Sequence, residues 1–304
     1  MRNTIFLLTQ DGDSCVDTIM LWLQKYSKLE ILRINETDRL SLVNLRLCKL
    51  GYEYVIKVND QLEINSNNLA AFYYRRGDLK SNSIQIRNNR FATDKDSILL
   101  LNEFTKRVHS YYVDEWNDVA ETIFYLLKND PNIFSLNSFF DIKVNKLINL
   151  KIATDLKINI PSTLISNDLI EIKTFMEKYN AIIAKPIKNP GAKFTIGKYA
   201  NGFSQHTNVF TMTDYHELCE NSQYFQPTLF QEYIEKDFEI RTFYLKDSFF
   251  SMAIFSQKNL QTKVDYRNYD TKLPNRNVPY KISTSLERKL SKLMIRLGYD
   301  SGSI

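Results

Sequence analysis

The feature that most constrains the fold is an apolar strand that runs into a polar turn and a second strand. The first strand reads Thr228-Leu229-Phe230-Gln231-Glu232-Tyr233-Ile234, and Asp237-Phe238-Glu239-Ile240-Arg241 follows at once. Because side chains alternate along a strand, Glu239 and Arg241 face the same side of their sheet. The pattern predicts a hinge at Gln231–Ile234, with Glu232 and Glu239 seven residues apart across the turn.

A second constraint is Lys185, which stands in the apolar strand Ile182-Ile183-Ala184-Lys185-Pro186. An unpaired buried ammonium is costly, so one explanation is an anionic ligand such as a phosphate. The other explanation is an edge lysine whose ammonium reaches water. Lys146 lies in a helical segment upstream, and two lysines ahead of the hinge favour the phosphate.

The first ~130 residues alternate between strand and helix patterns, which is typical of an α/β domain. Strands are expected over residues 3–9, 29–35, 42–47, 52–58 and 70–76, and helices after the N-caps Asp13 and Ser14 and over 96–127. Asn129-Asp130-Pro131-Asn132 breaks the pattern and is the best linker candidate. We therefore expect one domain over residues 1–130 and a second over residues 136–304.

The second domain mixes helices and strands, so the fold class expected for the chain is α/β (α+β). Helices are expected over residues 141–156, 168–179 and 285–297, with Gly298 as the C-terminal cap of the last one. The Lys185 strand precedes a loop over 189–202, and paired strands are expected over 228–257, the second pair turning at 246–248.

Composition excludes several classes of function. The lysines and arginines are scattered and the net charge is only +5, so no nucleic-acid partner is expected. No apolar run approaches the roughly 18 residues that span a bilayer, so no membrane partner is expected either. Three distant cysteines, Cys15, Cys48 and Cys219, indicate free thiols in a reducing cytoplasm.

Other nucleotide and catalytic motifs are missing from the sequence. There is no G-x-G-x-x-G, no G-x-S-x-G, and no HExxH spacing among His109, His206 and His216. The stretch from Gly191 to Tyr199 is similar to a Walker A loop, but it has one residue too many and a tyrosine where Ser or Thr is needed.

The two lysines, the acidic hinge and the arginine-bearing strand, in this order, resemble the nucleotide site of ATP-grasp ligases. The resemblance becomes more specific when further stretches are added in chain order: Asp11-Gly12-Asp13-Ser14 leading to Trp22-Leu23, Leu32-Arg33-Ile34-Asn35, Tyr73-Tyr74-Arg75-Arg76-Gly77, Asn145-Lys146, Ile160-Pro161-Ser162-Thr163, Val264-Asp265-Tyr266-Arg267-Asn268-Tyr269, Pro274-Asn275-Arg276-Asn277-Val278-Pro279-Tyr280 and Gly302-Ser303-Ile304. Together they look like the ATP-grasp peptide maturases of the grasp-with-spasm type, which belong with the graspetide (microviridin-like) synthetases.

This resemblance implies an N-terminal pre-ATP-grasp domain and an ATP-grasp domain with its lid over about residues 160–230. Such enzymes phosphorylate an Asp or Glu side chain of a ribosomal precursor peptide. A Ser or Thr hydroxyl or a Lys amine of the same peptide then attacks the acyl phosphate and closes a macrolactone or macrolactam. The implied partner is that precursor peptide, and a homodimer is considered.

The implied cofactors are ATP and Mg²⁺. Lys146 and Lys185 bind phosphates, and the hinge residues Gln231, Glu232, Tyr233 and Ile234 hold adenine, mainly through their backbone. Glu239 holds the ribose, and Arg241 and Arg267 steady the acyl phosphate. A structural salt bridge is the alternative for Arg267.

The sequence departs from the family pattern at its end. In the family, Gly-Ser-Ile is followed by an Asp and, further on, by a Glu-x-Asn that holds Mg²⁺, whereas this sequence stops at Ile304. We therefore expect an incomplete C-terminal sheet, an apparently truncated reading frame, no protein metal ligands, weak ATP binding and no ring closure by these residues alone.

Two other functions remain open. One is an ATP-grasp ligase that joins an amino acid to a free acid or a protein tail, using the same ATP site. The other is an inactive peptide-binding fragment that has lost its metal site.

Overall fold

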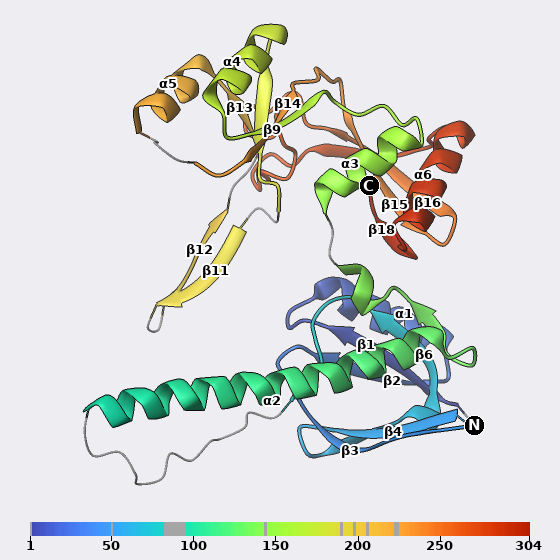
Figure 1. Ribbon diagram of the computed structural model, residues 1–304. Coiled ribbons are helices and arrows are strands. Elements are labelled where there is room, and N and C mark those ends of the chain that lie inside the picture. Colours follow the sequence, from blue (N-terminus) through green and yellow to red (C-terminus); the bar gives the residue numbers. More distant parts are fainter. Residues whose placement is uncertain are drawn as a thin grey trace. The chain divides into compact units, whose positions relative to one another are not determined.

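The computed structural model describes residues 2–49, 51–81, 95–142, 145–188, 191–196, 199–204, 207–221 and 225–304. The chain divides into two compact units, Met1–Ile142 and Lys143–Ile304, each with its own core (Figure 1). The predicted linker at residues 129–132 lies inside the first unit, directly after its long helix. No helix in the described ranges is long and apolar enough to cross a membrane.

The first unit is built on a parallel sheet with the strand order β2-β1-β6-β8. Its strands are β1 (Thr4–Thr9), β2 (Glu30–Asn35), β6 (Leu69–Tyr74) and β8 (Phe134–Leu136). Every residue of β1 is buried, as expected for a central parallel strand that is covered on both faces. Helix α1 (Ser14–Tyr26) covers one face through Val16, which packs against Ile5 and Leu7.

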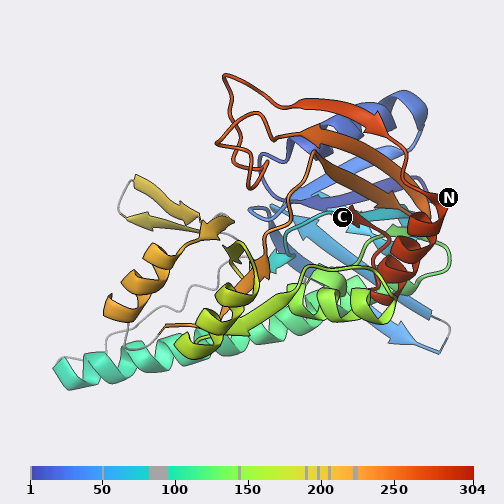
Figure 2. The same ribbon diagram turned by 90° about the horizontal axis from the view of Figure 1, so that it is seen from above.

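A second, mixed sheet covers the other face of β1 together with helix α2 (Lys95–Asn129). Its order is β5-β4-β3-β7, with β3 (Arg39–Cys48), β4 (Gly51–Val58), β5 (Leu62–Asn65) and β7 (Lys80–Ser81). Short 3₁₀ helices follow at Ser66–Asn68 and Phe139–Ile142. Figures 1 and 2 both show α2 running far past the sheet that its C-terminal half packs on.

The second unit begins with the antiparallel sheet β13-β10-β14-β9. Its strands are β9 (Thr163–Ser166), β10 (Ile182–Lys185), β13 (Asn208–Phe210) and β14 (Thr228–Glu232). Helices α4 (Leu169–Lys178) and α5 (Met212–Asn221) lie side by side against it, as Figure 2 shows, and share a core with Ile182 and Phe230. This sheet therefore holds Lys185 and the hinge on neighbouring strands.

The C-terminal sheet has the order β17-β16-β15-β18. Its strands are β15 (Glu239–Leu245), β16 (Ser248–Phe255), β17 (Arg276–Tyr280) and β18 (Ser301–Ser303). Helices α3 (Lys146–Asp155) and α6 (Thr284–Arg296) pack together beside it around Ala153, Leu290 and Leu293. Gly298 has φ +76 and closes α6, as predicted, with its N–H donating to Ile295.

Three details differ from the predictions. The helix expected over residues 141–156 begins at Lys146, because the Asn145 side chain caps it by accepting the N–H groups of Leu147 and Ile148. The loop expected over 189–202 contains the hairpin β11 (Gly191–Ile196) and β12 (Tyr199–Ser204), whose small residues gave no strand signal; residues 189, 190, 197 and 198 lie outside the described part. Strand β14 pairs with β9 and β10 and not with β15, so the hinge joins two sheets.

Candidate active site

Two adjoining cavities lie within the second unit, with volumes of about 680 Å³ and 390 Å³. Both are lined by Lys185, Thr207, Asp265, Arg267 and Ile304. The walls come from the two sheets, from α3 and α6, and from the loop between β16 and β17. A ligand in this region is therefore held from both sides of the hinge.

All nine residues predicted from the sequence line these cavities. Four line the larger one: Lys146, Lys185, Gln231 and Arg267. Seven line the smaller one: Lys185, Glu232, Tyr233, Ile234, Glu239, Arg241 and Arg267. The structure thus brings together residues that are up to 121 positions apart in the chain, from Lys146 to Arg267.

The two lysines are half-buried and bind only neutral groups. The Lys185 ammonium donates to Gln231 Oε1 at 2.8 Å, and Gln231 Nε2 donates to Thr163 at 2.9 Å. The Lys146 ammonium donates to the carbonyl oxygens of Pro186 (2.7 Å) and Lys188 (2.8 Å). Among the described residues neither lysine forms an ion pair with a carboxylate, although Asp265 lies close enough to Lys185 to attract it.

The pKa values of both lysines respond to this environment. Burial and then the positive charge of Arg267 lower the pKa of Lys185; the Asp265 carboxylate partly offsets them, and Lys236 and Lys146 make smaller lowering contributions. Burial and Arg267 also lower the pKa of Lys146. The cations therefore repel one another, and an anionic ligand between them relieves that repulsion.

One backbone N–H of the hinge has no hydrogen-bond partner among the described residues. The N–H of Glu232 donates to Ser162 O at 3.1 Å, and the N–H of Tyr233 donates to Ala181 O at 2.9 Å. The N–H of Ile234 has no partner among the residues that the structure describes. The Glu232 carboxylate accepts the N–H of Ser162 at 2.9 Å, so it also fixes the end of the sheet.

Sequence reasoning missed Lys236, which lies in the smaller cavity. Its ammonium forms an ion pair with Glu239 and donates to Val264 O at 3.0 Å. Each of the two paired side chains is about 20% exposed. The sequence held a signal for this pair, because Lys236 precedes Glu239 by three residues within the hinge turn.

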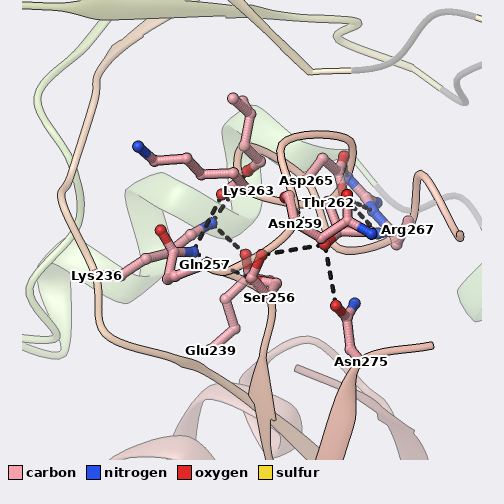
Figure 3. A network of polar contacts seen from close by, with 11 residues as sticks. Lys236, Glu239, Ser256, Gln257, Asn259, Thr262, Lys263, Asp265, Arg267 and Asn275 are labelled. Carbon is pink, nitrogen blue, oxygen red and sulfur yellow. Dashed lines mark hydrogen bonds and ion pairs between the residues drawn. The ribbon is translucent and has the colours of Figure 1, made fainter. Parts of the chain in front are cut away.

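Asp265 and Arg267 form a bidentate ion pair on the loop between β16 and β17 (Figure 3). Arg267 Nε and Nη2 donate to the carboxylate at 2.8 and 2.6 Å, and the Arg267 N–H donates at 3.0 Å. Burial raises the pKa of Asp265, but hydrogen bonds from Arg267 and Thr207 outweigh burial and bring it to about 2. The salt bridge considered for Arg267 exists, yet its side chain still lines both cavities.

Hydrogen bonds between polar groups of the same loop give it its shape. Thr262 is fully buried, and its hydroxyl lies 3.1 Å from Ser256 O and 3.0 Å from Asn275 Oδ1 (Figure 3). Asn259 Nδ2 donates to Asp270 at 2.8 Å. These contacts tie the start of the loop to its end, so Asp265 and Arg267 sit on a fixed support.

The side chains around the two cavities carry a net positive charge. Five cations, Lys146, Lys185, Lys236, Arg241 and Arg267, face three carboxylates, Glu232, Glu239 and Asp265, which gives +2. The guanidinium of Arg241 has no hydrogen-bond or ion-pair partner in the described part of the chain. An elongated polyanion with an apolar or aromatic end fits this distribution. Its charged part would contact the cations, and its uncharged end would lie against the hinge.

A protein-held divalent metal fits the described residues less well. Asp265 is engaged by Arg267, and Glu239 is engaged by Lys236. No group of three or more His, Cys, Asp or Glu side chains that could hold a metal occurs among the described residues. The cavity carboxylates Asp265 and Glu239 are therefore already engaged by cations of the chain.

No protein-family model matches the chain, and no curated protein does. Solved structures match nearly all of it. A Chryseobacterium gregarium RiPP-associated ATP-grasp ligase in complex with ADP, a leader and a core peptide matches with a TM-score of 0.71 and 21% identity, over 99% of this chain and 84% of that one. Macrocyclase MdnC bound with precursor peptide MdnA, from Microcystis aeruginosa MRC, gives 0.69 and 19%, over 99% and 86%. ATP-grasp ligase PsnB complexed with precursor peptide PsnA2 and AMPPNP gives 0.65 and 13%, over 100% and 83%.

Proposed function

We propose that this chain, which has the fold of the ATP-grasp ligases, is an ATP-dependent peptide cyclase. It activates an Asp or Glu side chain of a ribosomal precursor peptide as an acyl phosphate. A Ser or Thr hydroxyl or a Lys amine of that peptide then displaces the phosphate, leaving an ester or amide crosslink. The observation that carries the proposal is the gathering of five cations around the two cavities, of which Lys146, Lys185 and Arg241 form no ion pair with any described residue.

The cavities support one orientation of ATP. We assign adenine to the hinge, where the N–H of Ile234 has no partner among the described residues, and the ribose to Glu239, which lines the same cavity. Lys185 and Lys146 then meet the phosphates. Each lysine can keep its present partners, because an ammonium has three N–H groups. Lys236 is ion-paired with Glu239 and so holds that carboxylate in place.

The chemical step moves a phosphoryl group onto the substrate carboxylate. A carboxylate oxygen bonds to the γ-phosphorus, the bond from that phosphorus to the β,γ-bridging oxygen breaks, and ADP leaves. The nucleophile then adds to the acyl carbon, loses its proton and expels phosphate. We assign to Arg241 and Arg267, which line the smaller cavity, the stabilisation of charge that develops on the transferring group.

Magnesium enters this proposal as part of Mg·ATP, with phosphate oxygens as ligands. PsnB was solved with a minimal precursor, Mg and ADP. When bound, the ion neutralises phosphate charge. The described carboxylates of this chain do not assemble a site for it.

Co-expression with an adjacent short gene tests the proposal, provided that the gene encodes a peptide with an acidic, Ser/Thr/Lys-containing C-terminus. We expect the peptide to lose one water per crosslink in mass spectrometry. Lys185→Met is the matched control and should abolish the loss.

A second arm tests the first half-reaction in vitro, with the protein in excess over the peptide so that a single turnover is observed. Hydroxylamine traps an acyl phosphate as a hydroxamate. Hydroxamate without crosslinks would assign carboxylate activation but exclude ring closure by this chain. ATP binding without hydroxamate would favour the peptide-binding fragment. Hydroxamate on free amino acids alone would favour the amino-acid ligase.

A further inference from the structure

A third cavity of about 600 Å³ lies on the C-terminal sheet next to the 390 Å³ cavity, which we call the phosphate cavity from here on. Its floor is one face of β15 and β16, with Arg241, Phe243, Phe250, Met252 and Ile254. Its rim comes from the loop after β16 and includes Tyr266 and Tyr269. Arg241 and Tyr266 line both this cavity and the phosphate cavity, so the two are continuous.

The strand register orders this floor into rows. Glu239 lies opposite Ile254, Arg241 opposite Met252, and Phe243 opposite Phe250. Along this face, the first row therefore contains the Glu239 carboxylate, the second the Arg241 cation, and the third the two phenylalanine rings. Successive rows are about 7 Å apart, because residues i and i+2 of a strand share a face.

The aromatic end of this face is open to solvent. Phe250 is 61% exposed, and Phe243 and Met252 are each 42% exposed. Large apolar side chains grouped on one face mark binding sites more often than scattered ones do. The guanidinium of Arg241 lies at the boundary of this group and has no hydrogen-bond or ion-pair partner among the described residues. A negatively charged ligand therefore complements it.

We propose that this face, defined by Arg241, Phe243, Phe250 and Met252, is a specificity subsite for an acidic peptide with a large apolar side chain near the reacting carboxylate. The proposal rests on the proposed function, because it takes the carboxylate at Arg241 as the phosphoryl acceptor. The apolar side chain covers the Phe243–Phe250 row.

The spacing of the rows defines the peptide further. An extended peptide along β15 places the side chains of residues i and i+2 on one face, about 7 Å apart, which matches the separation of the Arg241 and Phe243 rows. The preferred substrate therefore has an aromatic or large aliphatic residue two positions from the acidic one. Tyr266 and Tyr269, whose rings meet edge to face at 6.3 Å, form the opposite wall.

Two short synthetic peptides test the subsite. Both contain one Glu, and they differ only two positions away, where one has Phe and the other Ala. Binding is measured by titration calorimetry with the full chain, with and without ADP. We expect the Phe peptide to bind roughly 10-fold more tightly. In Phe250→Ser this preference should fall below about 3-fold, because the ring that covers the ligand is gone.

The matched control is Ile165→Ser, which also removes an exposed apolar strand residue of the second unit but lies outside all three cavities. It should keep the full preference. Equal binding of the two peptides by the unaltered chain would overturn the proposal. So would a Phe250→Ser variant that dissociates a dimer in light scattering while keeping the preference, because the face would then bind a second copy.

ADP titrations in the same samples separate this inference from the proposed function. If the unaltered chain does not bind ADP but still prefers the Phe peptide, the nucleotide site is contradicted and the peptide subsite is not. ADP binding together with equal peptide affinities would contradict the subsite alone.

Discussion

The two units of the chain use buried charge in opposite ways. In the first unit, Arg2 donates to Asp130 at 3.0 Å, and the Tyr52 hydroxyl donates to the same carboxylate at 2.6 Å. Burial raises the pKa of Asp130, but hydrogen bonds from Tyr52, Asn132 and Arg2 lower it overall. In the second unit, Lys146 and Lys185 contact only neutral oxygens, and their pKa values are lowered by burial and by Arg267.

The difference separates structural charge from functional charge. Asp130 has its counter-ion and its donors in the folded chain, so nothing more is needed to satisfy it. The cations around the cavities repel one another until an anion arrives, and folding alone does not relieve that repulsion. Replacing residues of each kind should therefore affect different measurements.

The largest effect is expected for Arg241→Ala. Arg241 is exposed beside the phosphate cavity, and a group that stabilises developing charge acts mostly in the transition state. The single-turnover rate of hydroxamate formation should fall about 10²–10³-fold. ATP affinity, measured by calorimetry, should change far less. Equal losses in both would make Arg241 a ground-state phosphate anchor.

Asp130→Ala should act on stability alone. It leaves Arg2 and the Tyr52 hydroxyl without their acceptor, so the free energy of unfolding in urea should fall by about 2–3 kcal/mol. ADP affinity should stay unchanged. Glu53→Ala is the matched control, because the Arg46–Glu53 pair is exposed and 3.7 Å apart, and it should cost less than about 1 kcal/mol. If the free energy of unfolding fell equally in Asp130→Ala and Glu53→Ala, the buried Arg2–Asp130 pair would be no more stabilising than the exposed Arg46–Glu53 pair.

Lys185→Met should show the reverse pattern. ADP affinity should fall roughly 10- to 30-fold, because one charge-assisted hydrogen bond to phosphate is lost. The melting temperature without ligand should stay level or rise, because a half-buried cation near Arg267 is removed and the apolar stem is kept. Lys178→Met, on an exposed part of α4, is the control and should change neither. A lower melting temperature would show that the Lys185–Gln231 contact is structural.

The smallest effect concerns pH. Burial and Arg267 favour the neutral form of Lys185 in the folded protein, so its folded pKa lies below the ordinary lysine value of 10.5. Between these two values the unfolded chain binds more protons, and ligand-free stability should rise with pH. Bound phosphate favours the charged form, so ADP affinity should fall over the same window by a few-fold. Lys185→Met should flatten both profiles; profiles unchanged by the substitution would assign the titration to another group.

Features of the site that depend on neighbouring residues could be predicted from the sequence, whereas those that depend on contacts between distant residues could not. Strand patterns around Lys185 and Gln231–Glu232 are local, so the sequence places them on strands, and the parallel-sheet core around β1 is equally evident from its apolar run. The pairing of β14 with β10 instead of β15 is decided by contacts some 46 residues apart, such as Lys185 with Gln231. The three-residue spacing of Lys236 and Glu239 was a local signal for their ion pair, but its place in the cavity depends on how the turn after the hinge folds.

The loop between Ser256 and Asn275 has a consequence for how such a protein can evolve. Its shape rests on hydrogen bonds among its own polar groups, with Thr262 at the centre, so the position of Arg267 depends little on the apolar sheet face below. Substitutions at Phe243, Phe250 or Met252 can then alter which peptide is accepted without displacing the phosphate-binding groups. Substrate preference can drift along a lineage while the phosphoryl-transfer chemistry stays constant.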